Sequence, residues 1–305
     1  MIPTLPHPDR TVLLDGGTGR ELRRRGVPIL DTIWSANGLI VAPEVVRQVH
    51  QDYLAAGAEI ITTNSYGIIR ASLAKEGIEH RYAELNHMAG ALAQEARDRS
   101  GRKAFIAGSL PPLKGSYRPD RVGSFAEIEP LYEEQASLLA PYCDLMLCET
   151  MSSAAEAVAA ATAAAKSGLP VWVSWTLHED NSGRLRSGET VTQAAKALSH
   201  LSVSAYLVNC CTPESITAAM PELARLTAPV GGYANAFRPV PTDWVMERDG
   251  LLPKRDDLDP DSYAHHAHHW LDAGAKIVGG CCETGPAHIA RLKRLMEERS
   301  MRAGA

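Results

Sequence analysis

Short apolar stretches alternate strictly with longer stretches of helical periodicity along almost the whole chain, and this alternation constrains the fold most strongly. Eight apolar stretches predict strands, at Thr11–Asp15, Glu59–Asn64, Lys103–Ser109, Asp144–Glu149, Val171–Thr176, Ala205–Cys210, Val230–Asn235 and Lys276–Cys281. Eight helices are predicted to follow them, near residues 43–56, 80–99, 125–140, 152–167, 190–201, 213–227, 261–273 and 286–301. Strands separated by helices run parallel, so these units belong to the α/β class.

Eight strand-helix units close naturally into a (β/α)8 TIM barrel, in which the active site lies at the carboxyl ends of the strands. An open, doubly wound sheet is the structural alternative, and the number of units favours the barrel. No linker rich in Gly, Pro or Ser divides the chain. We therefore predict a single barrel domain over residues 1–305, with its core at about 11–300.

Charge and hydropathy exclude several classes of partner. The net charge is −5 and the longest basic run is Arg23–Arg25, so nothing indicates binding to nucleic acid or to an anionic membrane. No apolar run approaches the roughly 18 residues of a membrane span, and the Pro-rich segment Met1–Arg10 does not resemble a secretory signal. A cytoplasmic protein with small-molecule partners is expected.

Polar or small residues stand where most of the predicted strands end. A single such residue is more often a turn or cap, but ends of this kind on most of the strands indicate a shared active site. Two Pro-rich loops, Leu110–Gly123 and Phe237–Pro260, follow the third and seventh strands and are predicted to cover that site. The residues at the strand ends are Asp15, Gly16, Gly17, Asn64, Ser109, Glu149, Asn209, Cys210, Asn235, Cys281 and Cys282.

Four of the six cysteines form the adjacent pairs Cys210-Cys211 and Cys281-Cys282, at the ends of the sixth and eighth predicted strands. Three thiolates would leave a tetrahedral Zn²⁺ with one open position, as in catalytic zinc sites. Buried cysteines that act as small apolar residues are an equally good explanation of the spacing alone, and a vicinal disulfide is a weaker one.

Several motifs together resemble the zinc-dependent homocysteine S-methyltransferases, over about residues 11 to 300. They are Asp15-Gly16-Gly17-Thr18-Gly19, Thr63-Asn64-Ser65-Tyr66, Glu149-Thr150, Asn209-Cys210 and Gly279-Gly280-Cys281-Cys282. The resemblance implies a TIM barrel with Zn²⁺ on Cys210, Cys281 and Cys282. Cys211 is then an extra thiol beside the motif.

The resemblance also implies the reaction, which is transfer of a methyl group to the zinc-bound thiolate of homocysteine to give methionine. Glu149 and Asp15 are expected to hold the ammonium group of homocysteine. Backbone N–H groups around Gly16 and Gly17 are expected to meet its carboxylate. Asn64 and Asn209 are expected as supporting contacts, with Asn209 orienting Cys210.

The methyl donor is less determined than the acceptor. Family members use S-methylmethionine, S-adenosylmethionine, betaine or corrinoid-bound methyl, and the chain has no appended cobalamin domain. The loop Leu110–Asp120 departs from the Gly-Ser-Glu-Tyr stretch of members that use sulfonium donors. The family includes both monomers and larger assemblies, so a homo-oligomer stays open.

Two other functions are compatible with the residues alone. One is a thiol-rich zinc-binding or redox protein without transferase activity. The other is an unrelated barrel lyase with Glu149 and Asp15 as acid and base. The histidines of segment 265–269 have the spacing of one helical face, which fits a second metal site less well than a solvated polar face.

Overall fold

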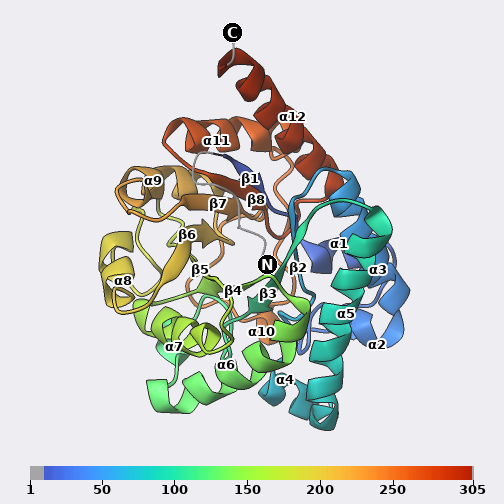
Figure 1. Cartoon of the computed structure of the whole chain (residues 1–305). Coiled ribbons are helices and arrows are strands. Elements are labelled where there is room, and N and C mark those ends of the chain that lie inside the picture. Colours follow the sequence, from blue (N-terminus) through green and yellow to red (C-terminus); the bar gives the residue numbers. More distant parts are fainter. Residues whose placement is uncertain (1–9, 304–305) are drawn as a thin grey trace.

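The computed structural model describes residues 10–303, whose strands form a barrel surrounded by helices (Figure 1). All eight strands pair in parallel, in the order β1-β8-β7-β6-β5-β4-β3-β2. The strands are β1 (Val12–Leu13), β2 (Ile60–Thr62), β3 (Phe105–Leu110), β4 (Leu145–Met151), β5 (Val171–Trp175), β6 (Val203–Asn209), β7 (Val230–Ala234) and β8 (Ile277–Gly280). The predicted barrel and all eight predicted strands are confirmed.

The barrel closes between its first two strands. Leu14 and Ile60 form an isolated parallel bridge, Asp15 N donates to Ile60 O at 3.0 Å, and Glu59 N donates to Leu13 O at 2.8 Å. This short seam joins β1 to β2. An open sheet, the alternative, is therefore excluded.

Each predicted helix is present in the outer layer. They are α3 (Pro43–Ala55), α5 (Tyr82–Ser100), α6 (Phe125–Leu139), α7 (Ala154–Ala165), α8 (Val191–Ala197), α9 (Pro213–Leu223), α11 (Pro260–Asp272) and α12 (Pro286–Ala303). Short helices that were not predicted lie in the connecting loops, namely α1 (Thr18–Arg24), α2 (Asn37–Val41), α4 (Arg70–Lys75) and α10 (Met246–Asp249). These helices are too short to show a clear helical period in the sequence.

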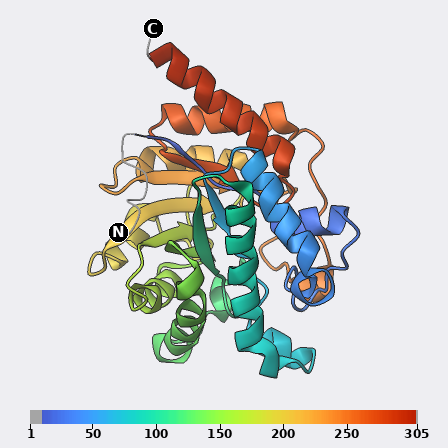
Figure 2. The same ribbon diagram turned by 45° about the vertical axis from the view of Figure 1, so that its right-hand side comes forward.

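Two apolar layers hold the barrel together. Side chains such as Leu145, Leu147 and Trp172 fill its interior, and a larger cluster lies between the strands and the surrounding helices. Figure 2 shows how the helices lie around the strands. Alanines dominate the buried residues of α7, which lets this helix pack closely on its neighbours. The interior is a packed core, so the cavity lies above it at the strand ends.

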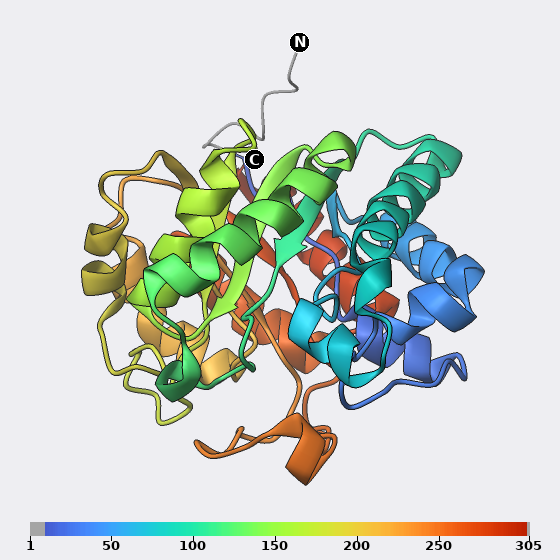
Figure 3. The same ribbon diagram turned by 90° about the horizontal axis from the view of Figure 1, so that it is seen from below.

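The loops at one end of the barrel are the longest. In Figure 3 the orange segment that carries α10 projects from the body of the molecule. Within residues 10–303, no helix combines the length and the apolar character that a bilayer crossing needs. Residues 1–9 and 304–305 lie outside the described part of the chain. The prediction that Met1–Arg10 is not a secretory signal therefore falls almost entirely on residues that are not described.

Candidate active site and metal centre

The carboxyl ends of the strands open into a cavity of about 370 Å³. Most of the predicted site residues line it, namely Asp15, Gly16, Gly17, Asn64, Glu149, Cys210, Cys281 and Cys282. Asn209 is not part of the wall. Both Pro-rich loops contribute wall residues, among them Tyr117 and Trp244, so the prediction that these loops cover the site is confirmed.

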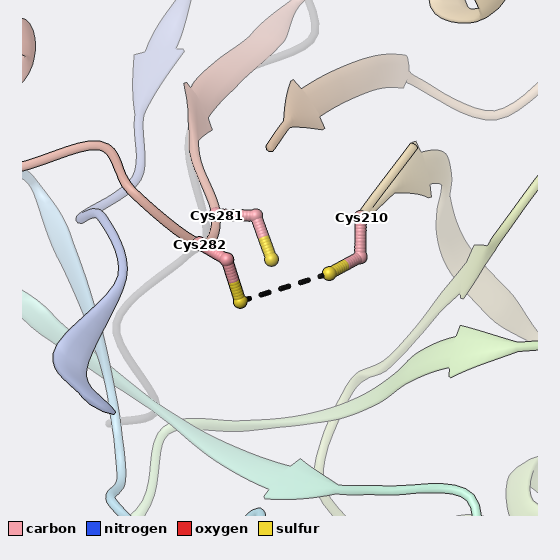
Figure 4. Close-up of side chains that lie close together, drawn as sticks. All are labelled: Cys210, Cys281 and Cys282. Carbon is pink, nitrogen blue, oxygen red and sulfur yellow. Dashed lines mark hydrogen bonds between the residues drawn. The ribbon is translucent and has the colours of Figure 1, made fainter. Parts of the chain in front are cut away.

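Three thiols converge on this cavity (Figure 4). Cys210 follows β6, whereas Cys281 and Cys282 follow β8, and the three sulfur atoms all lie within 4.8 Å of one another. The Sγ atoms of Cys210 and Cys282 are 3.9 Å apart. Cys210 has φ +50°, a left-handed backbone that is uncommon for non-glycine residues and is enriched at functional sites.

Glycines let the chain segments approach closely enough for this convergence. A Cβ on Gly17 would lie 2.5 Å from the carbonyl oxygen of Cys281, and one on Gly280 would lie 2.0 Å from Oγ1 of Thr284. Neither Gly279 nor Gly280 has positive φ, so the pair before Cys281 serves close packing rather than a left-handed turn.

The three thiols fit a tetrahedral metal ion. Two sulfurs at about 2.3 Å from one zinc ion and at a tetrahedral angle lie roughly 3.8 Å apart, close to the separation of Cys210 and Cys282. Hydrogen bonds from Cys281 and Cys282 lower the pKa of Cys210, whereas the pKa values of Cys281 and Cys282 themselves are raised. A bound dication would allow all three to ionise.

Cys211 lies away from this cluster although it is next to Cys210. Its side chain is fully buried in the apolar layer between strands and helices, and burial raises the pKa of its thiol. Cys211 therefore packs as an apolar residue and is not among the converging thiols.

An apolar cover lies over the thiols. Cys210 packs with Tyr117 from the loop after β3 and with Phe237, Val240 and Leu252 from the loop after β7. The phenol oxygen of Tyr117 is 3.0 Å from Sγ of Cys210. Such a cover excludes water and strengthens electrostatic interactions at the thiols.

A buried ion pair supports this cover from below. Arg186 lies 3.3 Å from Glu179, with side chains only 2% and 3% exposed, and its guanidinium lies over the ring of Tyr117 at 5.0 Å. Arg186 also donates to the carbonyl of Val240, and the Val240 N–H donates to Glu179. The ion pair thus joins the loop that carries Tyr117 to the loop that carries Val240.

Loss of the Tyr117 hydroxyl is expected to weaken metal binding. In Tyr117→Phe the ring keeps its packing, but the hydrogen bond to Sγ of Cys210 disappears, so the affinity of the three thiols for zinc should fall by roughly tenfold to a hundredfold. Competition with a chromophoric chelator measures this change. Tyr66→Phe is the matched control, because the Tyr66 hydroxyl also lies at the cavity but bonds Ser116 at 2.6 Å. Equal affinity in Tyr117→Phe and the native protein would refute the assignment.

Asp15 and Glu149 are buried carboxyl groups at the cavity wall. Asp15 accepts from the N–H and hydroxyl of Thr62 at 2.7 and 3.0 Å. Glu149 accepts from Ser109 at 2.5 Å and from Tyr233 at 3.2 Å. Burial raises the pKa of Asp15 to about 8 and that of Glu149 to about 7, although these hydrogen bonds act in the opposite direction. A substrate cation would favour their ionised forms.

The raised pKa of Asp15 predicts a pH-dependent effect of Asp15→Asn on stability. The carboxyl group of Asp15 releases its proton near pH 3.8 in the unfolded chain but only near pH 8 in the folded, metal-free protein. Between these values the free energy of unfolding of the unmutated protein therefore falls as pH rises. Relative to the unmutated protein, the free energy of unfolding of Asp15→Asn should rise by about 1.4 kcal/mol per pH unit between these limits. Urea unfolding from pH 5 to 8 measures the slope, and a pH-independent difference would contradict the raised pKa.

The two asparagines occupy different places. Asn64 lines the cavity and donates to the carbonyl of Ser35 at 2.9 Å. Asn209 is fully buried, and its side chain accepts from Thr150 N and Ser174 Oγ while donating to Thr150 Oγ1. Asn209 thus braces Thr150, whose φ is +62°, from beneath the cavity wall.

Two features of the wall near the start of α1 were not predicted. The N–H of Gly17 donates to the carbonyl of Thr284 at 3.0 Å and so is already engaged. Arg20 lines the cavity, where it pairs with Glu283 at 3.1 Å and stacks on Phe237 at 4.8 Å. Arg20 follows the Asp-Gly-Gly-Thr-Gly motif directly, which is the one sequence signal that could have indicated it.

A TIM barrel that gathers three thiols at the open end of its strands could hold a metal ion at the place where enzymes of this fold have their active site. A sequence model of the homocysteine S-methyltransferase family matches residues 12–296. The chain therefore belongs to the homocysteine S-methyltransferase family and is a methyltransferase.

Individual relatives agree with this assignment. The chain is 32% identical over 302 residues to the homocysteine S-methyltransferase of Escherichia coli K12, covering 92% of this chain and 94% of that protein. Identity to homocysteine S-methyltransferase 4 of Zea mays is 30% over 312 residues, with 94% and 89% covered. The crystal structure of E. coli homocysteine methyltransferase MmuM in its metallated form matches with a TM-score of 0.79 at 30% identity, over 94% and 96% of the two chains. The resemblance seen in the sequence motifs is confirmed.

Proposed function

We propose that this enzyme holds one Zn²⁺ on Cys210, Cys281 and Cys282 and methylates homocysteine to methionine. The convergence of the three thiols at the cavity carries the proposal. When bound, zinc supplies an open coordination position at which a substrate thiol loses its proton and becomes a nucleophile. The membership of the family supports homocysteine as that thiol.

Glu149 and Asp15 bind the ammonium group of homocysteine in this proposal. Both carboxyl groups reach the cavity wall and are held in place by hydrogen bonds from Ser109 and Thr62. An incoming cation lowers their pKa and stabilises the carboxylates at neutral pH. Gly16, Gly17 and Asn64 bound the same part of the cavity and limit the room around the amino acid.

Arg20 provides a cation for the carboxylate of homocysteine. Its guanidinium lines the cavity beside the thiols, and although it pairs with Glu283 and donates to the carbonyl of Leu252, its Nε has no hydrogen-bond partner. The N–H of Gly17, in contrast, is engaged with Thr284. A guanidinium is a better partner for a carboxylate than a single backbone N–H. We therefore assign this contact to Arg20 in addition to the backbone near Gly16.

A cationic sulfonium or ammonium compound is the methyl donor. Trp34, Tyr66, Tyr117, Phe237 and Trp244 line the cavity with aromatic rings, which attract cations. Transfer of CH₃⁺ from such a donor to the thiolate neutralises both partners, and the covered cavity keeps water from competing. S-methylmethionine, S-adenosylmethionine and betaine all have this chemistry.

The cellular setting follows from the cysteines. All six are free, and a reactive thiol cluster persists only in a reducing compartment, so we assign the enzyme to the cytoplasm. We also propose that the barrel acts as one domain, since every residue assigned a role lies within residues 12–296. The redox-protein and lyase alternatives lack this support from the family.

A donor panel tests the proposal. The purified enzyme with Zn²⁺ and homocysteine is given each of the three donors, and methionine is quantified by mass spectrometry. At least one donor should give methionine at a rate that depends on enzyme concentration. Failure of all three would refute the proposed reaction.

A further inference from the structure

Four histidines lie on α11, and two of them meet on its solvent face. His265 and His269 are both exposed, whereas His266 and His268 are half-buried. The Nε2 atoms of His265 and His269 are 3.1 Å apart. Their ring centroids are 4.6 Å apart with the planes at 84°. The two exposed imidazoles therefore face each other through one nitrogen each, at hydrogen-bonding distance.

This separation suits a shared metal ion. Two nitrogens 3.1 Å apart, each at about 2.0–2.1 Å from one ion, subtend an angle of roughly 100° at that ion. This angle lies between those of neighbouring ligands in octahedral and in tetrahedral complexes. A spacing of four residues on a helix holds both rings on one face, so little ordering is needed on binding.

The neighbouring side chains have other partners. His268 contacts Arg299 through Nδ1 at 2.6 Å, and His266 lies 3.9 Å from Glu214. Asp261 and Asp272, at the two ends of the helix, bind Arg291 and Arg299. The pair His265 and His269 thus stands apart from the ion pairs that tie α11 to its neighbours.

We propose that His265 and His269 form a second metal site on the outside of the barrel. Imidazole nitrogen favours borderline divalent cations, so the ligand class is Zn²⁺, Ni²⁺ or Cu²⁺ rather than Mg²⁺ or Ca²⁺. Water molecules complete the coordination. The site is distinct from the cysteine centre, whose ligands are sulfur and which lies in the cavity at the strand ends.

Titration of the zinc-loaded full-length enzyme with Ni²⁺ in a calorimeter tests this site. Ni²⁺ is used because Cu²⁺ oxidises thiols. The native protein should bind Ni²⁺ beyond its zinc, and His265→Ala or His269→Ala should weaken this binding by roughly tenfold or more, or about 1.4 kcal/mol.

His268→Ala is the matched control, because it removes an imidazole from the same helix but leaves the pair intact. It should bind Ni²⁺ as the native protein does. Equal Ni²⁺ affinity in His265→Ala and the native protein would overturn the proposal. The zinc content of each variant is measured separately, so a fault in the cysteine centre would appear there and not in the Ni²⁺ titration.

Discussion

Replacing Cys281 with alanine is expected to abolish zinc retention and to lower methionine formation by about 10³-fold or more, because the positioned thiolate nucleophile is lost. Cys281 is only partly buried, so the truncation should leave the barrel folded. Zinc per chain by elemental analysis and the rate of methionine formation are the two readouts. A variant that keeps full zinc content and activity would contradict the assignment of Cys281 as a ligand.

Cys211→Ala is the control for this variant. It removes a thiol adjacent to Cys210, but one that points into the apolar layer. We expect full zinc content and near-native activity, with about 1 kcal/mol of stability lost to the small cavity. Loss of zinc in Cys211→Ala would mean that the wrong member of the pair has been chosen.

Glu149→Gln is expected to lower kcat/KM for homocysteine by about 10²- to 10³-fold, which corresponds to roughly 3–4 kcal/mol for removal of one partner of a buried ion pair. The side chain has similar size and retains an oxygen that can accept from Ser109. Most of the change should appear in the KM of homocysteine rather than in zinc content. Steady-state kinetics at fixed donor concentration give the KM of homocysteine, and elemental analysis gives the zinc content.

Glu156→Gln is the matched control for Glu149→Gln. Burial also raises the pKa of Glu156 to about 7, and this carboxylate accepts hydrogen bonds from Ser152, but it is not part of the cavity wall. Its replacement should change stability without changing the KM of homocysteine. An equal rise in KM in both variants would indicate a structural rather than a binding role for Glu149.

The strands and long helices of the fold could be predicted because each has a strong local signal. Eight apolar stretches separated by amphipathic helices leave few alternatives to a barrel. Helices α1, α2, α4 and α10 were missed because their form depends on contacts made by the loops that contain them. α8 ends at Ala197, four residues before the predicted end, since its last turns are irregular.

The convergence of the three thiols could be predicted because they stand at the ends of predicted strands. The side chains that surround the thiols could not be predicted. Tyr117 is 93 residues from the cysteine that it contacts, and nothing local in the sequence marks that pairing. The ion pair of Arg186 and Glu179 lies within one loop, but its contacts with Tyr117 and Val240 join distant loops and likewise have no local signal in the sequence. Asn209 was recognised as important from its motif, yet only the structure shows that it supports Thr150 from beneath the cavity.

The central claim is that three thiolates hold the metal on which methyl transfer depends, and removal and return of zinc test it most directly. The enzyme is stripped with a chelator under reducing conditions, and methionine formation from homocysteine is measured before stripping, after stripping and after addition of one equivalent of Zn²⁺. We expect activity before stripping, loss of activity after it, and recovery at about one zinc per chain. Full activity in the stripped enzyme would contradict a role of the metal in methyl transfer.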